Sequence, residues 1–333
     1  MFQYHRLHDI EKGKIPDYLD SFIHVREFER LRDVGMACGL EYTSFPFFKD
    51  LFRYTRYDHS IGVSLLLTRF TDDIRIIIAG LYHDIATPCF SHVIDFLNHD
   101  NERQESTEEK TSTIIHGSVE IQKLLQEYHL KEEDINDYHK YPLSDNDTPR
   151  LSADRLEYHI GNALQYHNLT LEETKDILDD LTVLENEEGQ EEIGFRSQKA
   201  CQVFLKASLF NSKVYTADID RYSMEILSRI LKEDIDLGII TLDDLYGKER
   251  DLISKLESDQ RSKKTFDRFR SLDTLYSSDT PLDGYLQIKA KKRYVNPLVK
   301  GKGRILDLDF DLRKETDDFL LKDFSLYLKG KQI

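Results

Sequence analysis

A chain of 333 residues is long enough for one large domain or two smaller ones with a buried core. No run reaches the roughly 20 apolar residues that a membrane helix requires, and the charged N-terminus lacks the apolar centre of a signal peptide. The three cysteines are far apart and odd in number, which favours reduced thiols over a disulfide framework. These features predict a cytoplasmic protein without a membrane segment.

The formal net charge is −16. An acidic chain repels polyanions on average, so long nucleic acids are disfavoured as partners. The charge is uneven, however, because residues 287–306 contain seven basic residues and no acid. This basic segment suits a small polyphosphate, or it is a solvated loop that balances acidic neighbours.

Helical periodicity dominates residues 18–233. The pattern of apolar residues predicts helices over 22–34, 58–66, 74–85, 107–128, 151–166 and 197–231. The third of these helices is expected to end at Thr87-Pro88, because proline biases the preceding residue away from helix. Residues 181–195 are predicted to form a short hairpin or a loop with a turn at Gly189.

The pattern after Asp251 is less clear. Residues 284–299 alternate enough to hold one or two short strands, and residues 307–328 are predicted to be mostly helical. The change of pattern suggests a boundary near residue 240, which divides the chain into a core of residues 1–240 and an extension of residues 241–333.

Four residues of the helical part combine imidazole and carboxylate groups: His59, His83, Asp84 and Asp154. This donor set suits Fe, Mn, Zn or Mg better than a soft, thiophilic ion. His59 shares a helical face with Val63 and is therefore expected to point towards the core. Each of the four also has an ordinary interpretation as a hydrogen-bonded histidine or an ion-paired aspartate, so their spacing alone leaves the metal hypothesis open.

Two longer motifs supply context, RYDHSIGV at residues 56–63 and GLYHDIATPCFSHVID at residues 80–95. Together with DRLEY at residues 154–158 they resemble the HD-domain phosphohydrolases, and specifically the deoxynucleoside triphosphate triphosphohydrolase branch. KKRYVNPLV at residues 291–299 is similar to a C-terminal strand of that branch, with Asn296 where the branch has Asp.

The resemblance implies an all-α fold, in which an HD-domain helical core is joined to a smaller mixed C-terminal part that contains short strands. It also implies one divalent metal ion (Fe, Mn, Mg, Ni or Zn) held by the four residues above. The metal would polarise a phosphoryl group and activate a bound water. Members of the branch are often oligomers, so at least a homodimer is expected.

The resemblance further implies roles for residues outside the metal site. The expected catalytic residues are Arg56, His92, Asp95 and Glu108. The expected substrate-binding residues are Arg155, Tyr158, Lys292 and Arg293.

The sequence departs from the branch at two catalytic positions. The branch has a histidine three residues beyond its His-Asp pair, where this chain has Thr87. A second histidine opens a helix in the branch, and Glu108 stands at the best-fitting position, with His116 and His99 as alternatives. Without both histidines the usual proton donor to the leaving group is missing, which leaves the cleaved bond open.

Three functions therefore remain open. The first is a metal-dependent phosphohydrolase acting on a nucleotide or a small phosphate ester, with a dNTP as the nearest analogue. The second is a non-catalytic module that binds nucleotides or has a regulatory role. The third is a nuclease or a binder of single-stranded nucleic acid, which the basic segment favours but the acidic balance and the absence of tryptophan oppose.

Overall fold

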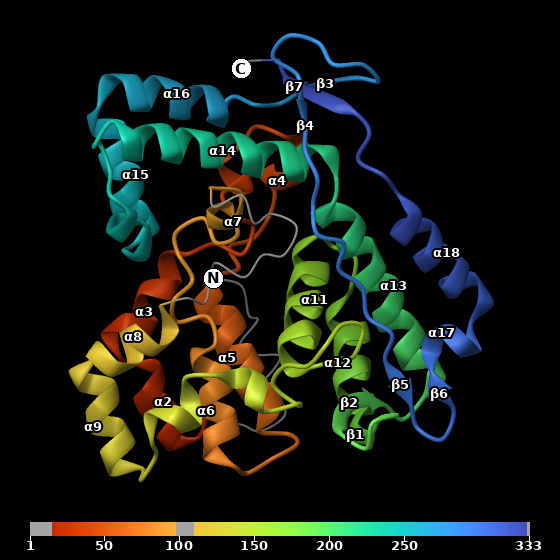
Figure 1. The fold of residues 1–333 in the computed structure, drawn as a ribbon. Helices are drawn as coiled ribbons and strands as arrows, with labels where there is room; N and C mark the ends of the chain where they lie inside the picture. The colour runs from red at the N-terminus through yellow and green to blue at the C-terminus, as the bar shows by residue number, and fades with distance from the viewer. Residues whose placement is uncertain (1–14, 98–109, 332–333) are drawn as a thin grey trace.

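The structure is a computed structural model that describes residues 15–97 and 110–331. Helices build most of it, and strands occur as a hairpin after α12 and as short pieces towards the C-terminus (Figure 1). The helices of the first half are α2 (Asp17–Ile23), α3 (Arg26–Glu29), η1 (Arg30–Asp33), η2 (Leu40–Tyr42), α4 (Pro46–Lys49), α5 (Arg56–Leu67), α6 (Ile74–Tyr82), α7 (Val93–Leu97), α8 (Thr111–Gly117), α9 (Val119–Glu127), α10 (Glu132–Ile135), η3 (Tyr138–Lys140) and α11 (Ala153–Gln165).

The second half contains the longest helices and all the strands of the described ranges. Its helices are α12 (Leu171–Asp180), α13 (Gln198–Tyr215), α14 (Asp218–Asp236), η4 (Leu242–Tyr246), α15 (Glu249–Ser258), α16 (Gln260–Arg270), α17 (Ile305–Leu308) and α18 (Phe310–Leu321). Its strands are β1 (Leu181–Glu185), β2 (Glu191–Phe195), β3 (Leu275–Ser278), β4 (Leu286–Gln287), β5 (Leu298–Val299), β6 (Gly303–Arg304) and β7 (Tyr327–Gly330). The expected fold class, a helical core with short strands in a mixed C-terminal part, is confirmed.

A first apolar core lies around α5, α6, α11 and α13. Helix α5 packs against both α6 and α11, and α11 packs against α13 (Figure 1). The stripe predicted for α6 explains its place in this core, because Ile77, Ile78 and Leu81 are fully buried. Residues from the C-terminal part, such as Val295 and Ile305, also belong to this core.

A second apolar core lies between α7 and the layer of α14, α15 and α16, which crosses the top of Figure 1. Strands β3, β7 and β4 form an antiparallel sheet beside it, in that order. The other sheet has the order β1-β2-β5-β6, and its single parallel pair joins β2 to β5 through Phe195 and Val299. Among the described residues, no helix has the length and apolar character needed to cross a bilayer.

Several predicted elements are confirmed with shifted ends. Helices α5 and α11 cover the stretches predicted as helix over 58–66 and 151–166. Strands β1 and β2 form the hairpin predicted for 181–195, with Gly189 in its turn at a φ of 75°. Strands β4 and β5 fall inside the segment 284–299, where one or two strands were expected.

Some predicted helices are interrupted. The helix expected over 22–34 is divided into α2, α3 and η1, because Val25 adopts an extended conformation and is itself buried. The helix expected over 107–128 breaks at Ser118, whose side chain caps α9 by accepting from the Ile121 amide. The helix expected over 197–231 breaks between α13 and α14.

Other predicted ends are wrong. The helix expected over 74–85 ends at Tyr82, and the side chain of His83 rather than a backbone amide donates to the Gly80 carbonyl. The closing helix expected over 307–328 ends at Leu321, and β7 follows because its backbone pairs with β3 and β4. Helices α15 and α16 were not predicted after Asp251, since each buries only a narrow apolar face. The domain boundary near residue 240 stays a prediction.

A buried acid connects α15 to the loop that follows α6. Glu249 is 1% exposed and accepts hydrogen bonds from the Tyr42 hydroxyl at 2.8 Å and the Phe90 amide at 3.0 Å. Burial, reinforced by the charge of Glu41, raises the pKa of Glu249 to about 8. Folding therefore favours the protonated acid.

This raised pKa predicts how stability depends on pH. The contribution of Glu249 is fully present below its unfolded pKa of about 4.3 and is lost as the pH rises through 8, since each unit of difference is worth about 1.4 kcal/mol. Replacing Glu249 with Gln should flatten the fall in melting temperature between pH 5 and pH 8.5, measured by circular dichroism. The exposed Asp251→Asn variant serves as control. A slope equal to that of the unmodified chain would contradict the prediction.

Candidate metal centre and adjoining pocket

Three helices bring two histidines and a carboxylate together. His59 lies on α5, His83 directly follows α6, and Asp154 lies in the first turn of α11. The Nε2 atoms of the two histidines are 3.1 Å apart, and Asp154 Oδ1 lies 3.0 Å from His59 Nε2 and 3.6 Å from His83 Nε2. Asp84 adds a fourth oxygen, because its Oδ2 lies 3.8 Å from His59 Nε2 and 3.6 Å from His83 Nε2.

The outer nitrogen of each ring is already engaged. His83 Nδ1 donates to the Gly80 carbonyl at 2.7 Å, and His59 Nδ1 donates to the fully buried carboxylate of Glu157. When a ring is neutral, it therefore directs the lone pair of its Nε2 at the other ring and at Asp154. Acceptors that converge in this way repel one another unless a cation or proton lies between them, so the residues present fit a metal ion.

The electrostatics of the metal-free group agree with that fit. Burial lowers the pKa of His59, but Glu157 and Asp154 outweigh it and raise the pKa to about 10. Burial also acts to raise the pKa of Asp154, yet its hydrogen bonds to both histidines hold that pKa well below the usual range. The site therefore retains negative oxygens and attracts positive charge, which a divalent cation supplies.

The loop after α6 fixes Asp84 and Arg56. Thr87 Oγ1 donates to Asp84 Oδ1 at 2.7 Å, and Arg56 Nη1 donates to Asp84 Oδ2 at 2.9 Å. Arg56 Nε also donates to Ser91 Oγ at 3.0 Å. Phe90 and Ser91 both have positive φ, at 59° and 47°, a conformation that costs energy in non-glycine residues and is often found at functional sites. Thr87, which stands where the branch has a histidine, thus orients the carboxylate of Asp84. Asp84 is one of the four candidate metal-binding residues, which are called the metal group below.

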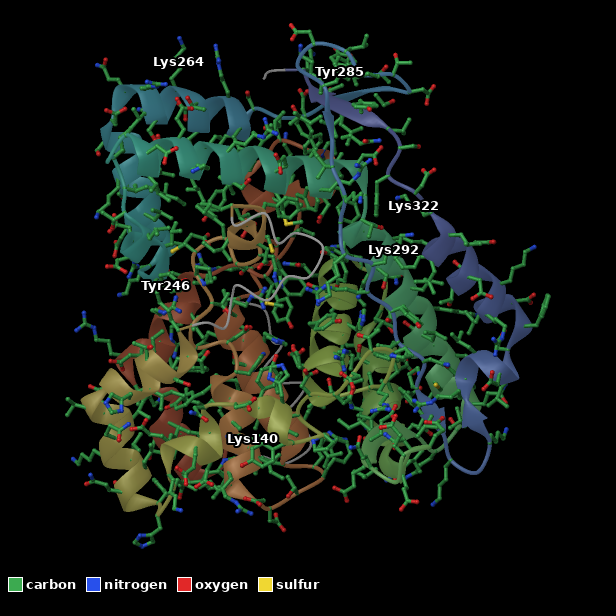
Figure 2. All side chains as sticks on the ribbon, in the orientation of Figure 1. Lys140, Tyr246, Lys264, Tyr285, Lys292 and Lys322 are labelled. Atoms are coloured by element: carbon green, nitrogen blue, oxygen red, sulfur yellow. The ribbon has the colours of Figure 1, made fainter. Side chains whose placement is uncertain are left out.

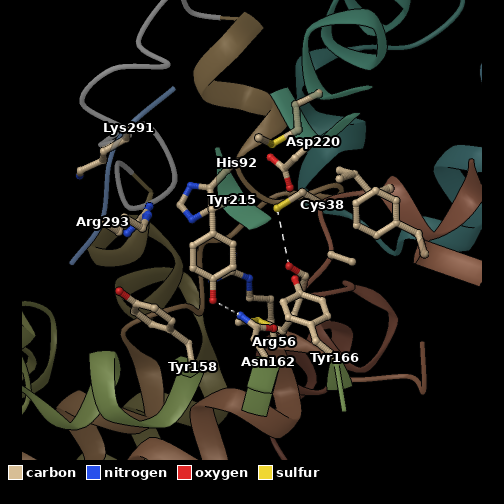
Figure 3. Close-up of a pocket in the computed structure, with 15 residues that line it drawn as sticks. Cys38, Arg56, His92, Tyr158, Asn162, Tyr166, Tyr215, Asp220, Lys291 and Arg293 are labelled. Atoms are coloured by element: carbon tan, nitrogen blue, oxygen red, sulfur yellow. Dashed lines mark hydrogen bonds between the residues drawn. The ribbon is translucent and has the colours of Figure 1, made fainter. Parts of the chain in front are cut away.

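A pocket adjoins the metal group and is shown in Figure 3. Arg56 belongs to both, because it pairs with Asp84 and also lines the pocket. Tyr158 lies one helical turn after Asp154 and lines the same pocket. The remaining polar and aromatic lining is supplied by Cys38, His92, Asn162, Tyr166, Tyr215, Asp220, Lys291 and Arg293.

Some predicted site residues meet in this pocket. His92 lines it and is held by Asp95, whose fully buried Oδ2 lies 2.8 Å from His92 Nδ1. Burial lowers the pKa of His92, so its neutral form is favoured near pH 7. Arg293 lines the pocket and hydrogen bonds to Tyr158.

Other predicted residues lie elsewhere. Arg155 points away from the pocket lining and binds Asn146 Oδ1 at 2.6 Å and Asp145 at 3.1 Å. Lys292 donates to the Leu320 carbonyl and lies near the Phe324 ring. Lys322 lies near the same ring, and Figure 2 labels both lysines. Glu108 lies outside the described residues, as does His99. His116 is exposed and pairs with Glu132 at 3.0 Å.

Sequence reasoning missed the roles of several residues. Glu157 was noted only as part of the DRLEY motif, although its spacing of three from Asp154 places both on one face of α11. Lys291, rather than its neighbour Lys292, lines the pocket, since alternate residues of an extended segment point to opposite sides. Asp220 gave no signal, because a single acid at the start of an amphipathic helix resembles an ordinary first-turn residue.

Together, the buried histidine–carboxylate group and the cationic pocket beside it form a candidate metal-dependent site in a mainly helical protein. Residues 56–179 match the family model described as HD domain, and all four candidate metal-binding residues fall inside that match. In that segment the chain resembles the HD-domain superfamily, including its deoxynucleoside triphosphate triphosphohydrolases and metal-dependent phosphohydrolases.

Curated relatives share parts of the chain. Protein YdhJ of Bacillus subtilis is 28% identical over 254 residues, which cover 74% of each chain. A Dictyostelium discoideum homologue of the deoxynucleoside triphosphate triphosphohydrolase SAMHD1 is 33% identical over 27% of this chain and 20% of its own length. The metal-dependent phosphohydrolase cns2 of Cordyceps militaris is 26% identical over 39% of this chain and 37% of its own length.

A solved structure has the same fold over nearly the whole chain. The crystal structure of a hypothetical protein from Aquifex aeolicus superimposes with a TM-score of 0.65 and covers 95% of this chain and 92% of its own. The two sequences are 20% identical, so this similarity concerns the fold alone.

Proposed function

We propose that the chain is a metal-dependent phosphohydrolase that acts on a nucleotide or a related small phosphate ester, with a dNTP as the nearest analogue. The observation that carries this proposal is that Arg56 lies between the metal group and the pocket. Arg56 contacts Asp84 on one side and lines the pocket on the other. A phosphate held by Arg56 would therefore lie next to the metal group.

The pocket supplies the cations that a phosphate requires. Arg56, Lys291 and Arg293 all line it. Arg56 is 7% exposed, and the pairing of its guanidinium with Asp84 keeps it charged despite burial. Such a cation, fixed before substrate arrives, stabilises the negative charge that develops during phosphoryl transfer.

A bound divalent ion would supply Lewis-acid polarisation of the phosphoryl group and an acidified water. His59, His83, Asp84 and Asp154 are the residues that would hold it. The neutral imidazole of His92, oriented by Asp95, would accept a proton on Nε2 and return it to the leaving oxygen. In this scheme His92, which lines the pocket, transfers the proton, although Thr87 replaces one family histidine.

A non-catalytic nucleotide-binding or regulatory role is the alternative, and Thr87 favours it because it cannot transfer a proton as a histidine does.

A homo-oligomer and a cytoplasmic location remain predictions from the sequence. Light scattering tests the oligomeric state.

The test is product analysis with metal-loaded protein. The full chain, purified without chelator, would be incubated with dNTPs, NTPs and nucleoside monophosphates, and the products resolved by chromatography. Free nucleoside plus triphosphate would identify the triphosphohydrolase reaction, and inorganic phosphate would identify a phosphatase. The His83→Ala variant, with folding checked by circular dichroism, should lose either activity. Metal-loaded protein that yields no product would refute the proposal and favour the binding role.

A further inference from the structure

One acid in the pocket, Asp220, has an oxygen that no described residue pairs with. Asp220 lies in the first turn of α14 and is 7% exposed. Its Oδ1 is buried, and no hydrogen bond reaches it from the residues that the structure describes. The neighbouring Arg221 does not serve it, because that guanidinium binds Asp218 and the Ile288 carbonyl. A buried polar group left unpaired destabilises the fold, so its presence calls for an explanation.

The pocket has two chemically different ends (Figure 3). Lys291 and Arg293 lie on one side of Tyr215, whereas Asp220 and Cys38 lie together on the other. The lining also includes the apolar residues Leu40, Phe48 and Met224. A ligand that fits this lining carries its negative charge at the cationic end and an uncharged, hydrogen-bonding group at the end of Asp220.

The Asp220 end excludes phosphate. Burial raises the pKa of Asp220 well above its usual range, and no cation or donor among the described residues offsets that effect. A phosphate there would meet either a carboxylate or an apolar wall, both of which disfavour an anion. The protonated acid, in contrast, offers a donor beside an acceptor, the pattern found along the polar edge of a nucleobase.

We propose that Asp220 is a specificity-determining residue that hydrogen bonds to the N–H edge of a nucleobase, which narrows the substrate class from phosphate esters in general to nucleotides. The proposal rests on the function proposed above, because it places the phosphate of the substrate at Arg56. The aromatic rings of Tyr166 and Tyr215 line the same pocket as Asp220 and provide surfaces against which a base packs.

The direct test is binding of deoxynucleosides, which carry the base but no phosphate. Calorimetry with the metal-free full chain would compare the four common deoxynucleosides with 2-deoxyribose 5-phosphate, which has no base. We expect at least one deoxynucleoside to bind, and Asp220→Leu to weaken it tenfold or more while leaving the sugar phosphate unchanged. Asp220→Asn, which keeps a donor beside an acceptor, should retain most of the binding. Asp236→Asn at the exposed end of α14 is the control.

Thermal stability separates recognition from a structural role. Removing an unpaired buried acid should raise the melting temperature of the ligand-free protein in Asp220→Leu. A fall in melting temperature that accompanies lost binding would show that Asp220 supports the fold, and would overturn the proposal. So would an equal loss of affinity for the deoxynucleoside and the sugar phosphate, or no deoxynucleoside binding at millimolar concentration.

The outcomes keep the two proposals apart. Asp220-dependent binding of a deoxynucleoside without any hydrolysis would refute the enzymatic function and preserve the role of Asp220. The second outcome is hydrolysis in which Asp220→Leu leaves the preference for a nucleotide over 2-deoxyribose 5-phosphate, measured as the ratio of kcat/KM, unchanged. That result would support the enzymatic function and refute the role of Asp220.

Discussion

Replacing Asp154 with Ala is expected to remove the bound metal from the purified protein and to lower phosphate-ester hydrolysis about a thousandfold or more. Asp154 Oδ1 lies 3.0 and 3.6 Å from the two histidine Nε2 atoms. Without it, the two imidazoles lose the negative charge that draws a cation between them. Metal content by mass spectrometry and turnover of the best substrate are the two measurements.

A second carboxylate of the same region provides the control. Asp145 is also buried, but it pairs with Arg155 at 3.1 Å rather than contributing to the histidine group. Asp145→Asn should therefore keep its metal. Stoichiometric metal in the Asp154→Ala protein would exclude Asp154 as a ligand and would move the proposed site away from α11.

The clustering of the candidate metal-binding residues could be anticipated because these residues lie inside contiguous motifs. His59, His83 and Asp154 each begin or follow a helix whose apolar stripe is readable, so the sequence indicates both the residue and the direction of its side chain. Their convergence required the resemblance to a known family, since no spacing rule relates three helices that pack through tertiary contacts.

The pocket was only partly predictable, because its lining comes from segments far apart in the chain. Lys291 and Arg293 reach it from an extended segment, and Asp220 reaches it from α14. The basic segment 287–306 was expected either to suit a small polyphosphate or to balance acidic neighbours. Arg304 does the second, because it is bound by Glu187 and Glu192. Composition located the basic segment, and only the packing decides which cations line the pocket.

The role of Glu157 shows how burial adds information that a motif lacks. Its carboxylate accepts from His59 Nδ1 and, at 2.5 Å, from the Tyr54 hydroxyl, and it is fully buried. Gly62 permits this approach, since a Cβ added there would lie 2.1 Å from Glu157 Oε1. A carboxylate in this position fixes the ring and strengthens the imidazole as a metal ligand.

Replacing Glu157 with Gln is therefore expected to weaken metal binding by about 10- to 100-fold while leaving all four candidate ligands in place. Glutamine keeps the size of the side chain, but its amide is uncharged and no longer increases the basicity of His59. Competition with a chelating dye measures the affinity, and turnover at saturating metal should recover much of the lost activity.

Tyr54→Phe provides the matched comparison, because it removes the other hydrogen bond to the same Glu157 oxygen without touching His59. If the carboxylate acts through His59, this variant should change metal affinity much less than Glu157→Gln. Equal effects of the two substitutions would mean that the buried cluster supports the fold as a whole. An unchanged affinity in Glu157→Gln would show that His59 does not depend on its outer partner, or that His59 lies outside the metal site.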